Sequence, residues 1–496
     1  MTNTTQTQTA PADTEPGEVS RLVLAATAAA REFGDPDNAP LRAQALRAIA
    51  DAMDGAADEL IPIAGEETAL AEARLTSELA RTTYQLRRLA DAVDEGSLFE
   101  ATIDAADPDW ALGPKPDLRR LLIGLGPVAM YSASNFPFAF SVAGGDTGAA
   151  LAAGCPVIVK GHPGHPRLSQ AVAKIVTDQL EAVGAPAGTF ALVLGLEAGK
   201  QLITEPGVKA GAFTGSVGAG RALFDAASAR PEPIPFYGEL GSINPAFVTA
   251  AALAARLGDI VEGFVASYTM GVGQFCTKPG FLFVPAGSGL SEDLAVAVRG
   301  VSSATMLNDR IAEGFATGLS ALSSVDGVEV LVEGEVSGRD AGPTLLATDV
   351  ATLLANQDTL LEECFGPTAI VVTYGDEKEL LDAAAAFTGN LTAAVHAEEH
   401  EAAGLAELLF LLRERAGRLL WNGWPTGVAV TWAMQHGGPY PATTASLFTS
   451  VGQTSIRRFL RPISYQGMPD AALPKVLRRE GAPSIVRRMD GQLVLP

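Results

Sequence analysis

The sequence predicts an α/β protein of several domains, and two observations lead to that prediction. Short apolar segments alternate with helical ones in the middle of the chain, with strands expected at 157–159, 190–194 and 208–213 and a helix at 168–183. Such an alternation is typical of βαβ units, which form a parallel sheet. The chain also has 496 residues, which is enough for roughly three domains.

The N-terminal part is predicted to form helices behind a short tail. Residues 1–18 are rich in Thr and have neither a basic nor an apolar run, so we expect a disordered tail that is not a signal peptide. From 19 to about 98, apolar residues recur three and four positions apart, as Leu46, Ile49 and Met53 illustrate. This spacing indicates amphipathic helices.

The pattern changes at Leu121, where apolar residues become continuous. We predict a strand within 121–130, and a buried helix over 138–153 because these residues are apolar on nearly every side and Gly154 follows them. The stretch 121–145 has no charge. Its Pro, Gly, Ser and Asn residues would leave polar groups unsatisfied in lipid, so we expect no membrane span.

A second α/β unit is predicted for 242–450, with strands near 280–284, 369–373 and 419–421. The charge then reverses: from Arg457 to the end, Lys and Arg outnumber Asp and Glu by eight to three. A basic terminal segment on an acidic protein is expected to dock on another part of the protein. We therefore predict an oligomerisation arm here.

The composition narrows the classes of function. The chain has 35 Lys and Arg against 57 Asp and Glu, a net charge of −22. This charge repels phosphate backbones, so we expect no nucleic-acid partner, and any anionic substrate must meet a local cation. Three cysteines without CxxC spacing argue against a disulfide framework and a cysteine metal site, and they fit a reducing compartment, the cytoplasm. His396 and His400 fall in a segment predicted to be a solvated loop or helix start, so we predict no metal.

Two segments carry residues suited to binding or to nucleophilic chemistry. The turn after the strand at 208–213 holds Gly215, Ser216 and Gly220, which either bring backbone N–H groups to a phosphate or form a plain strand–helix turn. Cys276 stands among Gly and polar residues, as an approachable thiol does, although an isolated cysteine is more often inert packing. The other two cysteines are predicted to be small packed residues.

Four further positions each have two interpretations. Glu239, at a strand end, is either a general base or a solvated loop residue. Asn135 either donates to an oxyanion or caps the helix that follows it. Lys160 ends a strand where ligands of parallel sheets gather, or it is simply solvated. The segment 362–367 is an ordinary acidic turn when taken alone.

Taken together and in this order, these segments resemble the aldehyde dehydrogenase superfamily over about residues 20–465. The family pattern has an Asn-Phe-Pro turn, a Lys closing the next strand, Phe-Thr-Gly-Ser, Glu-Leu-Gly, Gly-Gln-x-Cys and Glu-x-Phe-Gly-Pro. All six elements are present, as Asn135–Pro137, Lys160, Phe213–Ser216, Glu239–Gly241, Gly273–Cys276 and Glu363–Pro367.

Within the superfamily, the sequence is most similar to the NADP-preferring α-ketoglutaric semialdehyde (2,5-dioxopentanoate) dehydrogenases. The segments that carry this similarity are 131–140, 144–147, 160–163, 422–427 and 434–441. The resemblance implies oxidation of 2,5-dioxopentanoate to 2-oxoglutarate. Fatty-aldehyde enzymes share much of these segments, so a fatty or other aliphatic aldehyde is the alternative substrate.

The resemblance also implies the architecture. A Rossmann-type cofactor domain is expected at 19–105 and 125–241, an α/β catalytic domain at 242–450, and a small oligomerisation arm made of 106–124 and 451–496. The arm implies a homo-oligomer, a dimer or a tetramer. The other expected partner is the small-molecule aldehyde.

Three residues are implied to be catalytic. Cys276 as a thiolate attacks the aldehyde carbon, while the Asn135 amide and the Cys276 N–H hold the oxyanion. Loss of hydride gives a thioester, and water activated by Glu239 hydrolyses it to the acid.

The residues implied to bind the cofactor are Lys160, Gly215, Ser216, Gly220, Glu363 and Phe365. Lys160 is expected to hold the adenosine ribose or its phosphate, the turn at 215–220 the pyrophosphate, and Glu363 the nicotinamide ribose. Many NAD-dependent relatives have Glu three positions after the Lys, where it repels a 2′-phosphate, but Pro163 stands there in this chain. We therefore predict NADP as the preferred cofactor, with NAD admitted.

Two other functions stay open at this point. One is a CoA-dependent acylating dehydrogenase, against which Glu239 argues because a water-activating base serves hydrolysis. The other is a catalytically silent member of the fold used as a binding or structural protein. The presence of Cys276, Glu239 and Asn135 argues against it.

Overall fold

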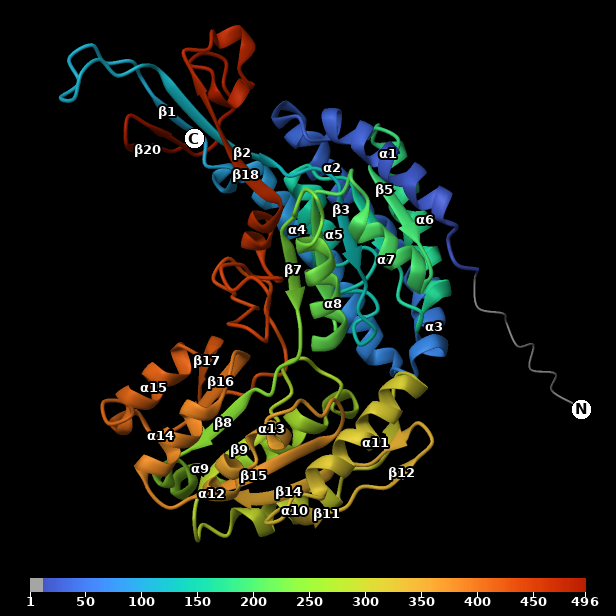
Figure 1. Cartoon of the computed structure of the whole chain (residues 1–496), viewed down its shortest axis with the longest axis vertical. Helices are drawn as coiled ribbons and strands as arrows, with labels where there is room; N and C mark the ends of the chain where they lie inside the picture. The colour runs from blue at the N-terminus through green and yellow to red at the C-terminus, as the bar shows by residue number, and fades with distance from the viewer. Residues whose placement is uncertain (1–11) are drawn as a thin grey trace, which may run out of the picture.

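The computed structural model describes residues 12–496 and contains three larger sheets and one small one. One larger sheet lies in the upper half of Figure 1, the second in the lower half, and the third projects at the upper left. The predicted α/β class is confirmed. Over the described residues, none of the helices has both the length and the apolar character needed to cross a bilayer.

Four long helices form the N-terminal part: α1 (Pro16–Phe33), α2 (Ala39–Gly55), α3 (Ala57–Thr68) and α4 (Glu72–Glu95). The predicted stripe of Leu46, Ile49 and Met53 on α2 is fully buried in the core of the upper half. Helix α1 begins at Pro16, because proline suits the first turn of a helix. The last three residues of the tail predicted at 1–18 are therefore helical, and residues 1–11 lie outside the described part.

The upper sheet is parallel throughout, in the order β5-β4-β3-β6-β7. Its strands are β3 (Val128–Tyr131), β4 (Val157–Lys160), β5 (Phe190–Val193), β6 (Ala210–Thr214) and β7 (Phe236–Glu239). The helices that follow or connect them are α5 (Gly145–Ala153), α6 (Pro166–Ala182), α7 (Leu196–Thr204) and α8 (Val217–Ser228). The three strands and the helix predicted for this region are confirmed to within two residues. Because the strands are parallel, Lys160 and Glu239 both leave the sheet at its carboxyl edge.

The helix predicted over 138–153 is too long, since α5 begins only at Gly145. The side chain of Glu78 in α4 accepts hydrogen bonds from the backbone N–H groups of Phe138 and Ala139, at 2.8 and 3.0 Å. These bonds satisfy the backbone of 138–139 without a helix, and the chain forms turns up to Gly145.

The projecting sheet, in the order β18-β2-β1-β19-β20, brings together the two segments predicted as an arm. Its strands are β1 (Thr102–Asp104), β2 (Leu118–Gly124), β18 (Leu460–Gln466), β19 (Arg487–Met489) and β20 (Gln492–Val494). The apolar run 121–130 is consequently not one strand. It divides at Gly126 and Pro127 between β2 of this sheet and β3 of the upper sheet.

The lower sheet has seven strands in the order β11-β14-β15-β9-β8-β16-β17, of which only β11 runs antiparallel to its neighbour. The strands are β8 (Pro245–Val248), β9 (Phe281–Pro285), β11 (Glu329–Val332), β14 (Thr344–Asp349), β15 (Thr368–Tyr374), β16 (Asn390–His396) and β17 (Ala416–Trp421). The helices of this half are α9 (Ala250–Thr269), α10 (Leu290–Arg299), α11 (Asp309–Ser323), α12 (Val350–Ala355), α13 (Gln357–Leu360), α14 (Glu377–Ala386) and α15 (Ala406–Arg413). A small sheet consists of β10 (Ala304–Thr305), β12 (Val336–Ser337) and β13 (Asp340–Ala341). All three strands predicted for this half are confirmed, as β9, β15 and β17.

Residues 422–452 form a crossing segment that returns from the lower sheet to the upper one. It leaves β17 as irregular chain and reaches the last strand of the upper sheet, where Thr443 pairs with Glu239 in an isolated β-bridge. It ends at the 3-10 helix η5 (Gln453–Phe459), which leads into the projecting sheet. The crossing segment thus touches the carboxyl edge of the upper sheet beside Glu239.

Candidate active site

Cys276 lies on the loop between the 3-10 helix η3 (Met270–Gly273) and β9 of the lower sheet. Two hydrogen bonds fix the conformation of this loop, because the side-chain amide of Asn244 donates to the backbone carbonyls of Cys276 and Lys278 at 2.8 and 3.0 Å. Gly273 has φ of +65°, and a Cβ there would collide with the Gly366 carbonyl. Cys276 is partly buried, whereas Cys155 and Cys364 are buried, so it is the most accessible of the three cysteines, as its sequence context predicts.

Glu239 is the last residue of β7 and is buried, with 4% of its surface exposed. This excludes the solvated-loop interpretation. The Ser450 hydroxyl donates to Oε2 at 2.6 Å, and Nε2 of His436 lies 3.0 Å from Oε1. Burial alone would raise the pKa of Glu239, but the hydrogen bonding of His436, Ser450 and Cys276 to its carboxylate outweighs burial and lowers that pKa. The carboxylate is therefore ionised at neutral pH.

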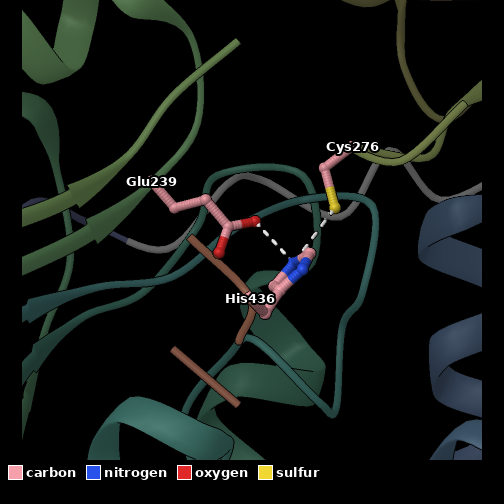
Figure 2. Close-up of side chains that lie close together, drawn as sticks. All are labelled: Glu239, Cys276 and His436. Carbon is pink, nitrogen blue, oxygen red and sulfur yellow. Dashed lines mark hydrogen bonds and ion pairs between the residues drawn. The ribbon is translucent and has the colours of Figure 1, made fainter. Parts of the chain in front are cut away.

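His436 lies between the thiol and the carboxylate, as Figure 2 shows. Its Nε2 is 3.6 Å from Sγ of Cys276 and 3.0 Å from Oε1 of Glu239, and the ring is 1% exposed. The residue is fixed by its backbone, because its N–H donates to Oγ1 of Thr449 at 2.8 Å and its carbonyl accepts from the Ser450 N–H at 2.9 Å. One ring nitrogen therefore faces both reacting groups.

Sequence reasoning assigned no role to His436. The residue is 160 positions from Cys276 and sits in irregular chain, so neither spacing nor periodicity joins the two. The available signal was its place in the Gln-His-Gly-Gly-Pro run at 435–439, where a polar ring precedes a turn-forming Gly-Gly-Pro segment.

The thiol of Cys276 needs a base in this environment. Burial raises the pKa of its Sγ, and the negative charges of Glu239 and Glu363 raise it further. A thiol so placed stays protonated at neutral pH, whereas the reactive form is the thiolate. Of the described residues, His436 brings a basic nitrogen within 3.6 Å of the sulfur. The arrangement can pass the thiol proton to the imidazole, and Glu239 stabilises the cation that results.

Asn135 is buried beside the loop that carries Cys276. Its side-chain amide donates to the backbone carbonyl of Gln274 at 3.1 Å, and its own backbone carbonyl accepts from Arg74 at 2.6 Å. An amide nitrogen has two N–H groups, so one donor remains beyond the Gln274 bond. The structure brings Asn135 to the loop that carries Cys276, and its role toward an oxyanion stays a prediction.

Three of the residues predicted to bind the cofactor lie at the carboxyl edge of the upper sheet. Lys160 ends β4, and Gly215 and Ser216 precede α8 in an exposed turn. The Ser216 side chain makes no cap hydrogen bond, and a Cβ at Gly218 would meet nothing within 4 Å. The first N–H groups of α8 therefore face open space, as binding of a pyrophosphate requires.

Gly220 is placed differently from the expectation. It is buried, and a Cβ there would collide with the Leu240 side chain. The absence of a Cβ lets α8 pack closely on Leu240, and a contact of Gly220 with the cofactor stays a prediction.

Glu363 and Phe365 approach the site from the lower half, between α13 and β15. Oε2 of Glu363 lies 2.6 Å from where a Cβ of Gly241 would stand, so the carboxylate packs against the segment that follows Glu239. Phe365 is partly buried next to it. The neighbouring Lys278 is buried, and its ammonium group donates to the carbonyls of Cys364 and Thr368 at 2.7 and 2.9 Å.

Glu239, Cys276 and His436 could also bind a metal ion, since their ligand atoms lie within 4.8 Å of one another. Spacing in the sequence gave no sign of this group, and the absence of a metal stays a prediction. The predicted solvated loop or helix start is present at Glu399, where a 3-10 helix begins, but His396 is not solvated. It ends β16 with 2% exposure, and its ring lies 4.2 Å from that of Trp424.

Comparison with known proteins gives a consistent picture. The profile of the aldehyde dehydrogenase family matches residues 2–440. The chain is 42% identical to an α-ketoglutaric semialdehyde dehydrogenase of Acinetobacter baylyi over 91% of this chain and 87% of that protein. It is 44% identical to α-ketoglutaric semialdehyde dehydrogenase 2 of Azospirillum brasilense, over 91% of this chain and 88% of that one. Among solved structures, an NAD-dependent aldehyde dehydrogenase from Sinorhizobium meliloti shares the fold, with a TM-score of 0.76 at 23% identity over 92% of this chain and 88% of that one.

Proposed function

Because the chain belongs to the aldehyde dehydrogenase family, we propose that it oxidises α-ketoglutaric semialdehyde (2,5-dioxopentanoate) to 2-oxoglutarate with NADP. The observation that carries the chemistry is the group of Cys276, His436 and Glu239, which supplies a nucleophile, a base and an ionised carboxylate within 4.8 Å. The identities of 42% and 44% to two dehydrogenases of this name support the substrate.

The first half of the reaction uses the thiol. Nε2 of His436 takes the proton of Cys276, and the resulting thiolate attacks the aldehyde carbon to give a thiohemiacetal on Sγ. The free N–H of the Asn135 amide and the backbone N–H of Cys276 stabilise its oxyanion, and one such donor contributes about 10²–10³-fold in rate. Lys160 and the turn at Gly215 and Ser216 would hold NADP, which would supply a hydride acceptor. Loss of hydride from this carbon leaves a thioester on Cys276.

The second half of the reaction uses the carboxylate. Glu239 has a lowered pKa, so it is ionised and can take a proton from water as the water attacks the thioester. The bond between the acyl carbon and Sγ breaks, and the acid leaves. Nε2 of His436, which lies 3.6 Å from Sγ and 3.0 Å from Oε1 of Glu239, stabilises the thiolate that is released.

The choice of NADP rests on the turn after β4. Pro163 is exposed there, three residues after Lys160, and it brings no negative charge toward a 2′-phosphate. We expect kcat/KM to be higher with NADP than with NAD. Pro163→Glu is expected to lower kcat/KM for NADP by about tenfold or more through like-charge repulsion, while the value for NAD stays near that of the wild type.

Steady-state kinetics with both cofactors check this expectation, and Pro163→Ala serves as the matched control because it changes the backbone without adding charge. A wild-type preference for NAD would contradict the proposal for the cofactor and leave the aldehyde oxidation untouched.

The test of the function is the formation of reduced nicotinamide by the purified protein with 2,5-dioxopentanoate, succinate semialdehyde and hexanal, in the absence of CoA. We expect the highest kcat/KM for the dioxo acid. Oxidation of hexanal alone would show that the substrates are fatty aldehydes. A requirement for CoA would replace hydrolysis by acyl transfer.

We also infer that the projecting sheet docks a second copy of the chain. Its edge strand β20 is followed by the C-terminal residues and exposes large apolar side chains, with Leu493 at 58% and Leu495 at 68%. An unpaired edge with apolar side chains is a site for association. Light scattering after size exclusion checks this, and a monomer would contradict it.

A further inference from the structure

The proposed substrate is an anion, and it must find a cation in a protein of net charge −22. The helix α4, which runs along the apolar side of the site, presents Arg74, Glu78 and Arg81 on one face because they are spaced four and three residues apart. The two arginines contact aromatic rings near the active centre and differ in how their hydrogen-bonding groups are used.

Arg74 is bound to the protein through Nη2, although its Nη1, like that of Arg81, is buried without a hydrogen-bond partner. Its Nη2 donates to the Asn135 carbonyl at 2.6 Å and lies 3.9 Å from Oε2 of Glu78. Its guanidinium carbon sits 4.9 Å from the ring centroids of both Phe136 and Phe275. Arg74 therefore balances the charge of Glu78 and positions the segments of Asn135 and Cys276.

Arg81 has no such partner. Its Nε donates to the Val428 carbonyl at 3.3 Å, and its Nη1 is buried without any hydrogen-bond partner. Among residues 12–496, no carboxylate oxygen lies within 4.0 Å of its guanidinium nitrogens. A partly buried guanidinium with an unsatisfied N–H is costly unless a ligand completes it.

The ring of Phe140 lies close to both Arg81 and His436. The guanidinium carbon is 5.8 Å from the Phe140 ring centroid, and the same ring lies 6.1 Å from that of His436. Burial lowers the pKa of Arg81, while the negative charges of Glu78 and Glu239 act to raise it. The rest of this wall is apolar, with Phe140, Val430 and Val451 in one buried cluster.

A third arginine, Arg418, binds backbone carbonyls of the crossing segment. Arg418 on β17 donates through Nη1 and Nη2 to the carbonyls of Gly427 and Pro425, at 3.2 and 2.7 Å. It holds the crossing segment through both of its terminal nitrogens, while its Nε is buried without a hydrogen-bond partner.

We propose that Arg81 binds the carboxylate at the far end of the aldehyde substrate and thereby selects short-chain aldehydes that end in a carboxylate. This inference rests on the proposed function. Phe140 contacts the carbon chain between the two ends, and Cys276 meets the aldehyde. A guanidinium offers two parallel N–H groups to a carboxylate, which an apolar wall cannot replace.

The test compares 5-oxopentanoate with pentanal, two aldehydes of equal length that differ in the carboxylate. Arg81→Met keeps much of the side-chain volume and removes the charge. We expect it to lower kcat/KM for 5-oxopentanoate and for 2,5-dioxopentanoate by about 10²-fold, mainly through KM because the carboxylate is remote from the reacting carbon. The value for pentanal is expected to stay unchanged, and Arg81→Lys to retain part of the preference.

The matched control is Arg88→Met, seven residues further along α4, where Arg88 pairs with Asp91 at the surface at 2.9 Å. This variant should leave kcat/KM unchanged for both 5-oxopentanoate and pentanal. Equal losses for 5-oxopentanoate and pentanal in Arg81→Met, or no loss for either, would overturn the proposal.

A binding measurement separates this proposal from the proposed function. Isothermal titration with 2-oxoglutarate needs no turnover, and we expect about 10²-fold weaker binding to Arg81→Met than to the wild type or Arg88→Met. If the wild type oxidised no aldehyde but showed this difference, the function would fail and the anion site would stand. Equal affinity of all three proteins for 2-oxoglutarate would contradict the anion site, whether or not the protein oxidises aldehydes.

Discussion

Replacing Cys276 by alanine is expected to lower kcat for aldehyde oxidation by about 10⁴-fold or more. Both the thiohemiacetal and the thioester are formed on Sγ, and the other two cysteines are buried away from solvent. The measurement is the formation of reduced nicotinamide under saturating aldehyde. Fluorescence of added NADPH should show that the variant still binds cofactor, because the cofactor-binding positions are unchanged.

Cys155→Ala is the matched control for this variant. Cys155 is fully buried at the start of β4, where its thiol contacts the Phe459 carbonyl at 3.5 Å, so its loss affects packing rather than chemistry. We expect a kcat close to the wild-type value. A Cys276→Ala protein that retained activity within about tenfold of the wild type would show that the nucleophile lies elsewhere.

Replacing His436 by glutamine is expected to lower kcat/KM by about 10³-fold at neutral pH. Glutamine keeps a polar amide near the position of Nε2 but cannot accept the thiol proton. The pKa of Cys276 is raised by its burial and by Glu239 and Glu363, so the thiol without its base ionises only at higher pH. The rise of kcat/KM with pH should therefore move to higher pH in His436→Gln.

Alkylation of the thiol by iodoacetamide measures the same property without turnover. The rate depends on the thiolate fraction, so it should be slower in His436→Gln than in the wild type at neutral pH and approach the wild-type rate as the pH increases. His400→Gln is the matched control, since His400 is exposed in a surface 3-10 helix. Identical pH profiles of alkylation in the wild type and His436→Gln would show that the imidazole does not act on the thiol.

The sequence was informative wherever a function depends on a short run of neighbours. The strand before Lys160, the exposed turn at Gly215 and Ser216, and the open context of Cys276 are all properties of a few adjacent residues, and the structure has them in place. Glu239 was harder, because its buried carboxylate is held by Ser450 more than two hundred residues away.

The parts that could not be predicted depend on contacts between distant segments. His436 gains its role from the route of the crossing segment, and Arg81 from what its neighbours leave unsatisfied. The helix predicted over 138–153 failed for the same reason, since the Glu78 side chain holds the backbone of its first two residues. An apolar pattern reports burial, but it does not report which side chain from elsewhere competes for the backbone.

The crossing segment has a consequence for how the enzyme loses activity. The nucleophile is fixed to the lower sheet, the carboxylate to the upper sheet, and His436 to the chain that spans them (Figure 2). A small rotation of one half against the other separates the thiol from its base while both cores remain intact. We therefore expect heating to abolish activity before either sheet melts, because the active site depends on the contact between the halves.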